Sequence, residues 1–219
     1  MRSCSPMRDD LRMSVGAILL LGGRSTRMGS PKAELDWNGE PLAVHMARLL
    51  QSAVDGPVVA VGAPEQQLPV LPAGVETARD HIANGGPLRG IEAGLAAIGD
   101  RADRVFVASV DAPLLHPAFV TALLGAFTEA DDLLVPDAQG FRHPLTAVWR
   151  TSVLPAVTAA LDDGIAGPGG IFDRVRTRFI DEAGLLALPG VATADPHLDS
   201  LRNANTPAEL AAARQRGSS

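Results

Sequence analysis

The sequence contains little cysteine and no long apolar run. Its single cysteine, Cys4, cannot form an intramolecular disulfide or a cysteine-based metal cluster, which favours a reducing compartment. No apolar run approaches the length of a membrane span, so no membrane partner is expected. The net charge of -6 argues against a nucleic-acid partner, whose affinity would depend on clustered cations. We therefore expect a cytoplasmic protein, and this net charge still allows nucleotide binding by a local positive loop.

Two familiar phosphate-binding motifs are also absent. No glycine directly precedes Lys32 and Ala33 follows it, which excludes the P-loop pattern G-x-x-x-x-G-K-[ST]. Gly22 and Gly23 are adjacent, which excludes the dinucleotide-binding pattern G-x-G-x-x-G.

No internal repeat, coiled coil or interdomain linker is visible. The chain of 219 residues suits one α/β domain with a full core.

The N-terminal residues do not form a convincing signal peptide. The cations of residues 1–14 are interrupted by Asp9 and Asp10, and no small-residue cleavage site follows the short apolar run. We interpret 1–14 as a disordered leader, with Met7 and Met13 as alternative start positions, and we expect one domain over 15–216.

The rest of the chain is organised around one stretch, 15–32. Its apolar run 17–21 is too short for a helix and is typical of a strand buried on both faces of a parallel sheet. Gly22 and Gly23 then end the run, and a loop rich in small and cationic residues follows. Free backbone N–H groups in such a loop attract anions, and Arg27 and Lys32 add full positive charges. The stretch therefore predicts a phosphate-rich ligand at the carboxyl end of a central strand.

Apolar segments and helical patterns alternate along the remaining chain. Strands are expected over 57–61, 75–78, 104–110, 133–136 and 145–149, and helices over 41–50, 88–98, 116–127 and 151–161. A hairpin-like turn is expected around Gly39, and a loop over 164–170. Thr206 and Glu209 have the spacing of a helix capping box. This alternation predicts a Rossmann-like, three-layer α/β/α sandwich around a mostly parallel mixed sheet.

Two aspartates are candidates for chemistry. Asp111 directly follows the expected strand 104–110, beside the crevice where open α/β sheets bind ligands. Mg²⁺ is typically held by one or two carboxylates together with phosphates and waters, so Asp111 is a candidate magnesium ligand, with a turn aspartate as the alternative. Asp80 offers two acceptors side by side, which match the ring N–H and amino group of guanine. The alternative for Asp80 is likewise a residue of a turn. Gly86 and Gly90, which follow it, could admit a ligand close to the backbone or merely start a helix.

The opening stretch resembles the signature loop L-x-G-G-x-S-x-R-M-G-x-x-K of nucleotidyltransferases with a glycosyltransferase-A-like fold, the nucleotide-diphospho-sugar transferase type. Its residues here are Leu20, Gly22, Gly23, Ser25, Arg27, Met28, Gly29 and Lys32. Further segments are similar to the molybdenum cofactor guanylyltransferase family, namely 86–90, 111–113, 143–150 and 203–207. The resemblance extends over nearly the whole chain after the leader, and it makes 15–216 a single nucleotidyltransferase domain.

The resemblance implies an enzyme that transfers GMP from GTP to the phosphate of molybdopterin and releases pyrophosphate, with Mg²⁺ as cofactor. It implies nucleotide contacts in the opening loop and at the two aspartates, phosphate contacts and charge stabilisation by the two cations, and acceptor contacts elsewhere. The implied nucleotide contacts are Leu20, Leu21, Gly22, Gly23, Asp80 and Asp111, and the two cations are Lys32 and Arg27. The implied acceptor contacts are Gly86, Gly90, Asn203 and Asn205. Asp111 would also hold the metal. Other proteins of molybdenum cofactor assembly are possible partners.

Three departures from the family pattern keep alternatives open. The end of the second strand, Ala60-Val-Gly62, lacks the asparagine that the family often has there as a nucleotide contact. The loop 164–170 replaces a basic Gly-x-Arg-type loop that is common in the family. The triplet beginning at Asp111 is Asp-Ala-Pro, whereas the commoner family form has threonine in the middle. The alternative functions are a related transferase that uses CTP or a sugar-phosphate acceptor, or a catalytically silent nucleotide-binding partner protein. For Asn203 and Asn205, the alternative is a loop that leads into the Thr206 cap.

Overall fold

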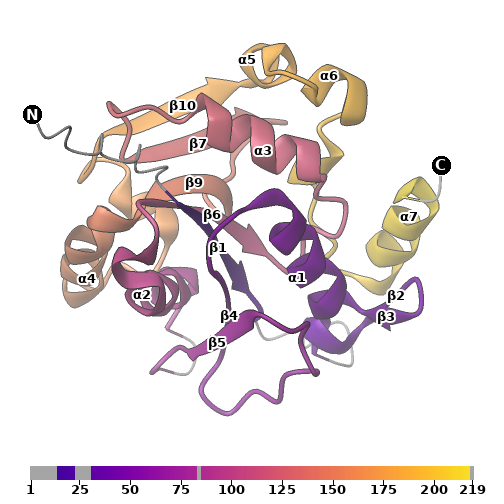
Figure 1. The fold of residues 1–219 in the computed structure, drawn as a ribbon, viewed down its shortest axis with the longest axis horizontal. Helices are drawn as coiled ribbons and strands as arrows, with labels where there is room; N and C mark the ends of the chain where they lie inside the picture. The colour runs from indigo at the N-terminus through magenta and orange to yellow at the C-terminus, as the bar shows by residue number, and fades with distance from the viewer. Residues whose placement is uncertain (1–13, 23–30, 83–84, 218–219) are drawn as a thin grey trace, which may run out of the picture.

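The computed structural model describes residues 14–22, 31–82 and 85–217. In this part of the chain, eight strands form one sheet that is covered by helices (Figure 1). The central strand is β1 (Val15–Leu20), which pairs in parallel with β4 (Val58–Gly62) and β6 (Arg104–Ser109). All three are rich in small and β-branched residues that are buried on both faces, as a parallel sheet requires.

The sheet is mixed, as the sequence predicts. Its order is β10 (Thr177–Asp181), β7 (Leu133–Ala138), β9 (Thr146–Arg150), β6, β1, β4 and β5 (Val75–Arg79), and β8 (Phe141–Arg142) pairs with β7. Strand β9 runs antiparallel to both of its neighbours, whereas the β6–β1–β4–β5 and β7–β10 pairs are parallel. The carboxyl ends of β1, β4, β5 and β6 therefore meet at one edge, which we call the carboxyl edge.

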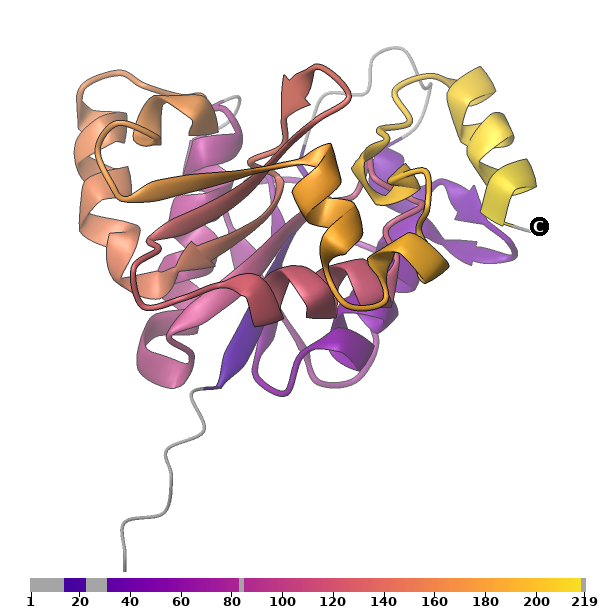
Figure 2. The ribbon, with the colours of Figure 1, turned by 90° about the horizontal axis from the view of Figure 1, so that it is seen from above.

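Helices cover both faces of the sheet (Figure 2), and one hydrophobic core lies on each face, between the sheet and its helices. Successive residues of β1 point to opposite faces, so Leu19 joins one core and Ile18 joins the other. Helices α1 (Leu42–Ala53) and α3 (Pro117–Ala126) pack on the first face, and α2 (Pro87–Ile98) and α4 (Leu154–Asp162) pack on the second. The three-layer α/β/α sandwich is thereby confirmed.

Two tight hairpins use residues with positive φ. Asn38 (φ 53°) and Gly39 (φ 93°) connect β2 (Asp36–Trp37) to β3 (Glu40–Pro41), which confirms the turn expected at Gly39. Gln139 (φ 55°) and Gly140 (φ 80°) connect β7 to β8 in the same way. Two successive positive φ angles define the turn type that matches the twist of antiparallel strands.

The C-terminal segment of the chain returns to the carboxyl edge. After β10 come α5 (Glu182–Ala187), α6 (Val191–Ala194) and α7 (Pro207–Gly217). Helix α7 lies beside the β2–β3 hairpin (Figure 1), with Leu210 and Ala213 buried. Short 3₁₀ helices complete the described chain: η1 (Lys32–Glu34), η2 (Gly99–Arg101), η3 (Thr151–Val153), η4 (Pro168–Ile171) and η5 (Asp199–Leu201). None of the described helices combines the length and apolar character needed to cross a membrane.

Candidate active site

The carboxyl edge brings Lys32, Asp111 and Asn205 together from three distant parts of the sequence. Lys32 is the first residue of η1, Asp111 follows β6, and Asn205 precedes α7. The Nζ atom of Lys32 donates a hydrogen bond to Oδ1 of Asn205 over 2.8 Å and lies 3.7 Å from Oδ2 of Asp111. The side chains of Lys32 and Asp111 are only 15% and 21% exposed, so water screens their charges only in part.

Asp111 retains capacity to bind a ligand. Its Oδ1 atom is buried and has no hydrogen-bond partner among the described residues. Its backbone carbonyl accepts a hydrogen bond of 2.7 Å from the N–H of Ala204, which fixes the 203–206 segment against the end of β6. A buried carboxylate oxygen without a partner is unfavourable unless a cation or a donor binds there. The site therefore has the kind of donor that Mg²⁺ prefers.

The segment that carries Asn205 is held by the capping box of α7, as the sequence predicts. The carboxylate of Glu209 accepts hydrogen bonds from the backbone N–H groups of Asn205 (2.6 Å) and Thr206 (3.0 Å), and the Thr206 hydroxyl accepts one from the N–H of Glu209 (3.2 Å). The Asn205 N–H is the main cause of the lowered pKa of Glu209, and the positive charge of Lys32 adds to it. Glu209 therefore stays ionised next to the site.

The start of the signature loop is tied to the neighbouring strands. The N–H of Leu21 donates to the carbonyl of Val61 over 2.8 Å, and the carbonyl of Leu20 accepts from the N–H of Val110 over 3.0 Å. Gly22 is exposed. The remaining part of the loop, with the predicted site residues Gly23 and Arg27, lies outside the described residues.

The other predicted site residues lie apart from the lysine–aspartate pair. Oδ1 of Asp80 accepts from the N–H of Ile82 over 2.9 Å in a local turn after β5. A Cβ atom on Gly86 would come within 2.6 Å of the Ala166 carbonyl, and one on Gly90 would come within 3.0 Å of Leu20. Close approach to the Ala166 backbone and a φ of 85° already require glycine at position 86, whereas Gly90 meets only the end of a leucine side chain. In the described chain, no hydrogen bond or ion pair connects Asp80 to Lys32, Asp111 or Asn205, and its role as a nucleotide contact stays a prediction.

Gln66 is a residue of this edge that the sequence did not indicate. Its Nε2 donates to the carbonyl of Leu21 over 3.0 Å, and its Oε1 accepts from the N–H of Ala63 over 3.1 Å. One side chain thus connects the carboxyl ends of β1 and β4. The segment 60–62 lacks the asparagine expected there, and the structure places a different carboxamide, that of Gln66, at the same end of β4. Its four-residue distance from β4 gave no recognisable signal.

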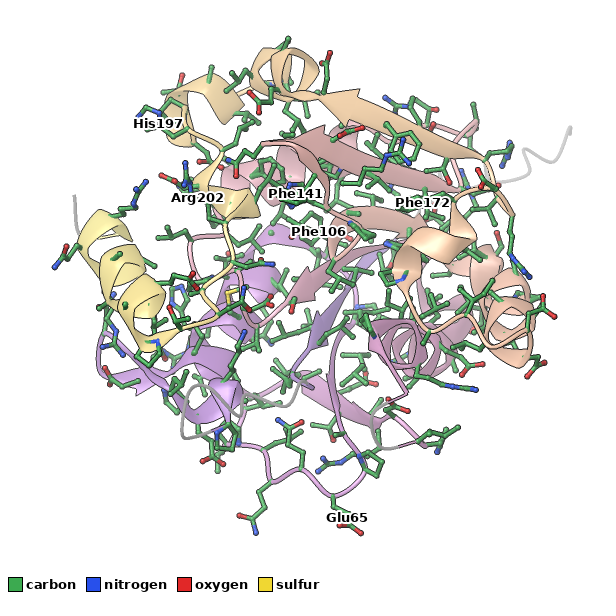
Figure 3. The ribbon with its side chains drawn as sticks, turned by 180° about the vertical axis from the view of Figure 1, so that it is seen from behind. Glu65, Phe106, Phe141, Phe172, His197 and Arg202 are labelled. Carbon is green, nitrogen blue, oxygen red and sulfur yellow. The ribbon has the colours of Figure 1, made fainter. Side chains whose placement is uncertain are left out.

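A groove of about 720 Å³ opens beside Asn205. Its lining comes from the β7–β8 hairpin, η5, the segment after it, and α7; it includes Phe141, Arg142, His143, Arg202, Asn203, Asn205 and Arg216. Phe141 is 72% exposed, and Figure 3 shows it on the same side of the molecule as Arg202. An aromatic ring next to guanidinium groups suits a planar ligand that carries negative charge. The loop 164–170 does not line this groove, because Ala166 lies against the start of α2.

The model of the MobA-like NTP transferase domain matches residues 17–177. The chain belongs to this family and is a nucleotidyltransferase. The match begins in β1 and extends to the first residue of β10.

Relatives with similar sequences are named for one activity. The molybdenum cofactor guanylyltransferase of Sinorhizobium fredii is 32% identical over 206 residues, which cover 91% of this chain and 90% of the relative. The probable molybdenum cofactor guanylyltransferase of Mycobacterium tuberculosis is also 32% identical, with 93% and 94% covered. Among solved structures, molybdopterin-guanine dinucleotide biosynthesis protein A from Archaeoglobus fulgidus superposes with a TM-score of 0.73 at 23% identity, covering 93% of this chain and 98% of that one. This superposition supports the fold.

Proposed function

We propose that the protein transfers GMP from GTP to the phosphate of molybdopterin and releases pyrophosphate. The observation that carries the proposal is the pair of Lys32 and Asp111 at the end of the central strands, in a chain whose relatives at about 30% identity are named for this reaction. In the reaction, an acceptor phosphate oxygen forms a bond to the α-phosphorus of GTP, and the bond from that phosphorus to the β-phosphate oxygen breaks in line.

Each residue of the pair has a distinct task. Lys32 is a compact positive charge that binds the triphosphate and stabilises the charge that develops on the leaving pyrophosphate. Asp111 would hold Mg²⁺ through its unpartnered Oδ1, together with phosphate oxygens and water. When bound, Mg²⁺ neutralises phosphate charge and helps to align the reacting groups. No covalent intermediate with the protein is required, because the protein accelerates the reaction by positioning the two substrates.

The groove beside Asn205 is the natural site for the acceptor. It adjoins the lysine–aspartate pair through Asn205, which contacts Lys32 and also lines the groove. The ring of Phe141 would stack on the planar part of molybdopterin, and Arg202 would attract its negative charge. Asp80, at the end of β5, is proposed to read the base, since a carboxylate accepts from two guanine donors at once.

The experiment compares all four nucleoside triphosphates at fixed Mg²⁺, first in binding without acceptor and then in turnover with molybdopterin. We expect clear preference for GTP, release of one pyrophosphate per GMP transferred, and a narrower preference in the Asp80→Asn variant. Lys32→Ala should reduce turnover about a hundredfold or more, with Arg48→Ala on the exposed side of α1 as control. Preference for CTP would reassign the protein to cytidylyl transfer, and binding without turnover would make it a silent nucleotide-binding protein.

A further inference from the structure

Lys32 is the only lysine in the chain, which otherwise uses arginine for its cations. Four rotatable carbon–carbon bonds place the ammonium group of a lysine side chain, so a free lysine would sample many positions. Here the ammonium has a defined position: it is 2.8 Å from Oδ1 of Asn205 and 3.7 Å from Oδ2 of Asp111. The shorter of the two contacts is to the neutral amide, and the charged partner is further away.

Asn205 is itself held from both sides. The preceding residue, Ala204, donates its N–H to the carbonyl of Asp111 over 2.7 Å. The N–H of Asn205 donates to Glu209, whose carboxylate also accepts from Thr206. The backbone of Asn205 is thereby fixed to the end of β6 on one side and to the first turn of α7 on the other.

Helix α7 is anchored at some distance from the site. Leu210 and Ala213 are buried in the core of the first face, and the guanidinium of Arg214 donates to the carbonyl of Asp36 in the β2–β3 hairpin. The capping box therefore belongs to a helix whose position is set by packing. A chain of contacts connects this packed helix to Lys32 through Glu209 and Asn205.

We propose that Asn205 is a positioning residue for Lys32, and that the capping box of α7 positions Asn205; this proposal rests on the proposed role of Lys32 in binding GTP. The Asn205 carbonyl oxygen directs the ammonium toward the phosphate site and keeps it from forming a close ion pair with Asp111. Without this bond, the ammonium would move onto the carboxylate, neutralise it, and occupy the position that a cation would take. Asn205 thus acts on the nucleotide side of the reaction, in addition to any contact with the acceptor.

The single lysine makes a direct test possible. Protein labelled only with ¹³C,¹⁵N-lysine has a single lysine Nζ signal, which reports on Lys32 in the absence of any substrate. We expect this signal to shift in Asn205→Ala and to shift less in Glu209→Ala. Gln67→Ala is the control, because Gln67 is an exposed carboxamide outside the groove that makes no described contact with Lys32. Its lysine signal should stay at the wild-type position.

Binding of GTP with Mg²⁺, measured without acceptor, is the second readout. Asn205→Ala should raise the dissociation constant about tenfold and Glu209→Ala about threefold. Glu209→Gln, whose amide oxygen can still accept from the two N–H groups, should recover most of the loss. Gln67→Ala should leave GTP binding within about twofold of wild type. Glu209 is exposed, so its variants are expected to fold, and they test the proposal if Asn205→Ala does not.

Two outcomes would overturn the proposal. An unchanged lysine signal in folded Asn205→Ala would mean that the contact does not hold Lys32, whichever nucleotide the enzyme prefers. Normal GTP affinity together with a raised KM for the acceptor would assign Asn205 to the acceptor alone. Failure of the proposed function gives a different result: wild-type protein would then prefer another nucleotide, while the lysine signal would still respond to Asn205→Ala.

Discussion

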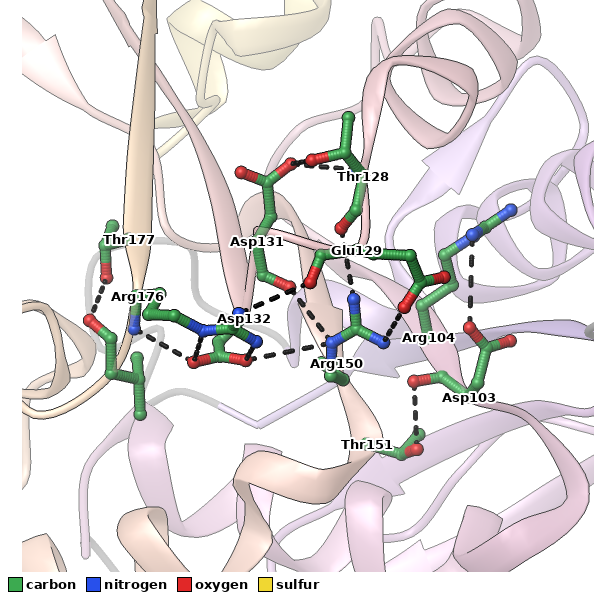
Figure 4. A network of polar contacts seen from close by, with 11 residues as sticks. Asp103, Arg104, Thr128, Glu129, Asp131, Asp132, Arg150, Thr151, Arg176 and Thr177 are labelled. Carbon is green, nitrogen blue, oxygen red and sulfur yellow. Dashed lines mark hydrogen bonds and ion pairs between the residues drawn. The ribbon is translucent and has the colours of Figure 1, made fainter.

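Charged side chains gather at the carboxyl edge and also at the opposite ends of the parallel strands, which we call the amino edge. The two clusters differ in how fully their carboxylates are paired. At the amino ends of β6, β7 and β10, acidic and basic side chains form the network in Figure 4. Asp131 accepts four hydrogen bonds, from the N–H and hydroxyl of Thr128 and from two nitrogens of Arg178, at 2.7 to 2.9 Å. Asp132 accepts three from Arg176, at 2.6 to 3.0 Å. These carboxylates have little capacity left for a ligand.

At the carboxyl edge, Asp111 has one cation at 3.7 Å and a buried oxygen with no described partner. The first network thus connects neighbouring strands, whereas Asp111 has a free oxygen that fits its proposed role in holding a metal ion. A carboxylate oxygen without a hydrogen bond is not sufficient for this interpretation, since both oxygens of Asp103 at the amino edge also lack one, with Arg104 at 3.9 Å. What distinguishes Asp111 is its place beside Lys32 at the ends of the parallel strands.

Asp111→Asn should give the largest effect. The amide has the same shape but no charge, so we expect Mg²⁺-dependent turnover to fall about a thousandfold while the melting temperature changes little. Turnover as a function of Mg²⁺ concentration, measured beside thermal unfolding, checks this. Asp163→Asn, at an exposed aspartate paired with Arg174, is the control. Retained turnover in the Asp111 variant would remove Asp111 from the metal site.

Asp131→Asn should show the opposite pattern. The change breaks charge-assisted hydrogen bonds of a nearly buried carboxylate, which should lower the free energy of unfolding by about 2 kcal/mol. Urea denaturation measures this loss, and turnover per folded molecule should stay close to wild type. A loss of turnover at full stability would mean that the two edges are functionally coupled.

The pH dependence of stability sharpens the same prediction. Burial alone would raise the pKa of Asp131, but hydrogen bonds from Arg178 and Thr128 outweigh it and lower the pKa. Hydrogen bonds from Arg176 are the largest cause of the lowered pKa of Asp132. Because the folded pKa values lie below the unfolded value of about 3.9, their stabilisation is present above about pH 4 and is lost as the pH falls through the folded values. The free energy of unfolding of the Asp131→Asn variant should therefore change less with pH below about pH 4 than that of wild type.

Gln66→Met should give the smallest of the three effects. Methionine has a similar length but cannot donate to Leu21 or accept from Ala63, so the backbone at the end of β1 would be less rigid. We expect KM for GTP to rise about threefold to tenfold with kcat almost unchanged, because only the positioning of the bound nucleotide is affected. Gln67→Met, at the exposed neighbouring residue, is the control. Equal kinetics in both variants would limit Gln66 to stabilising its loop.

Local signals in the sequence were sufficient for most of the fold. The strand expected over 17–21, the turn around Gly39 and the cap at Thr206 each depend on neighbouring residues. Each is confirmed, with the strand observed at Val15–Leu20. Strand β10 was missed because it is the outermost strand of the sheet. Its residues Thr177–Asp181 are partly buried or exposed and include no apolar run. The expected helix 151–161 begins later, at Leu154, after a 3₁₀ turn.

The site was harder to predict than the fold. Lys32 and Asp111 could be chosen one by one, because each follows a recognisable strand. The contact of Lys32 with Asn205 could not be predicted, since the two residues come from distant parts of the chain and no local pattern encodes such pairing. The bond of Gln66 to Leu21 was invisible for the same reason, because it depends on how the loop after β4 folds back.

The long separation of Lys32 and Asn205 also has a consequence for biosynthesis. The two residues are 173 positions apart, and ribosomes add about 5 to 20 residues each second, so their contact can form only roughly 10 to 35 seconds after Lys32 is synthesised. During that interval the nascent chain carries the signature loop and the central strands but lacks the residue that directs its lysine. A polypeptide released early, before the α7 cap has been translated, would therefore contain the recognisable motif without the complete site.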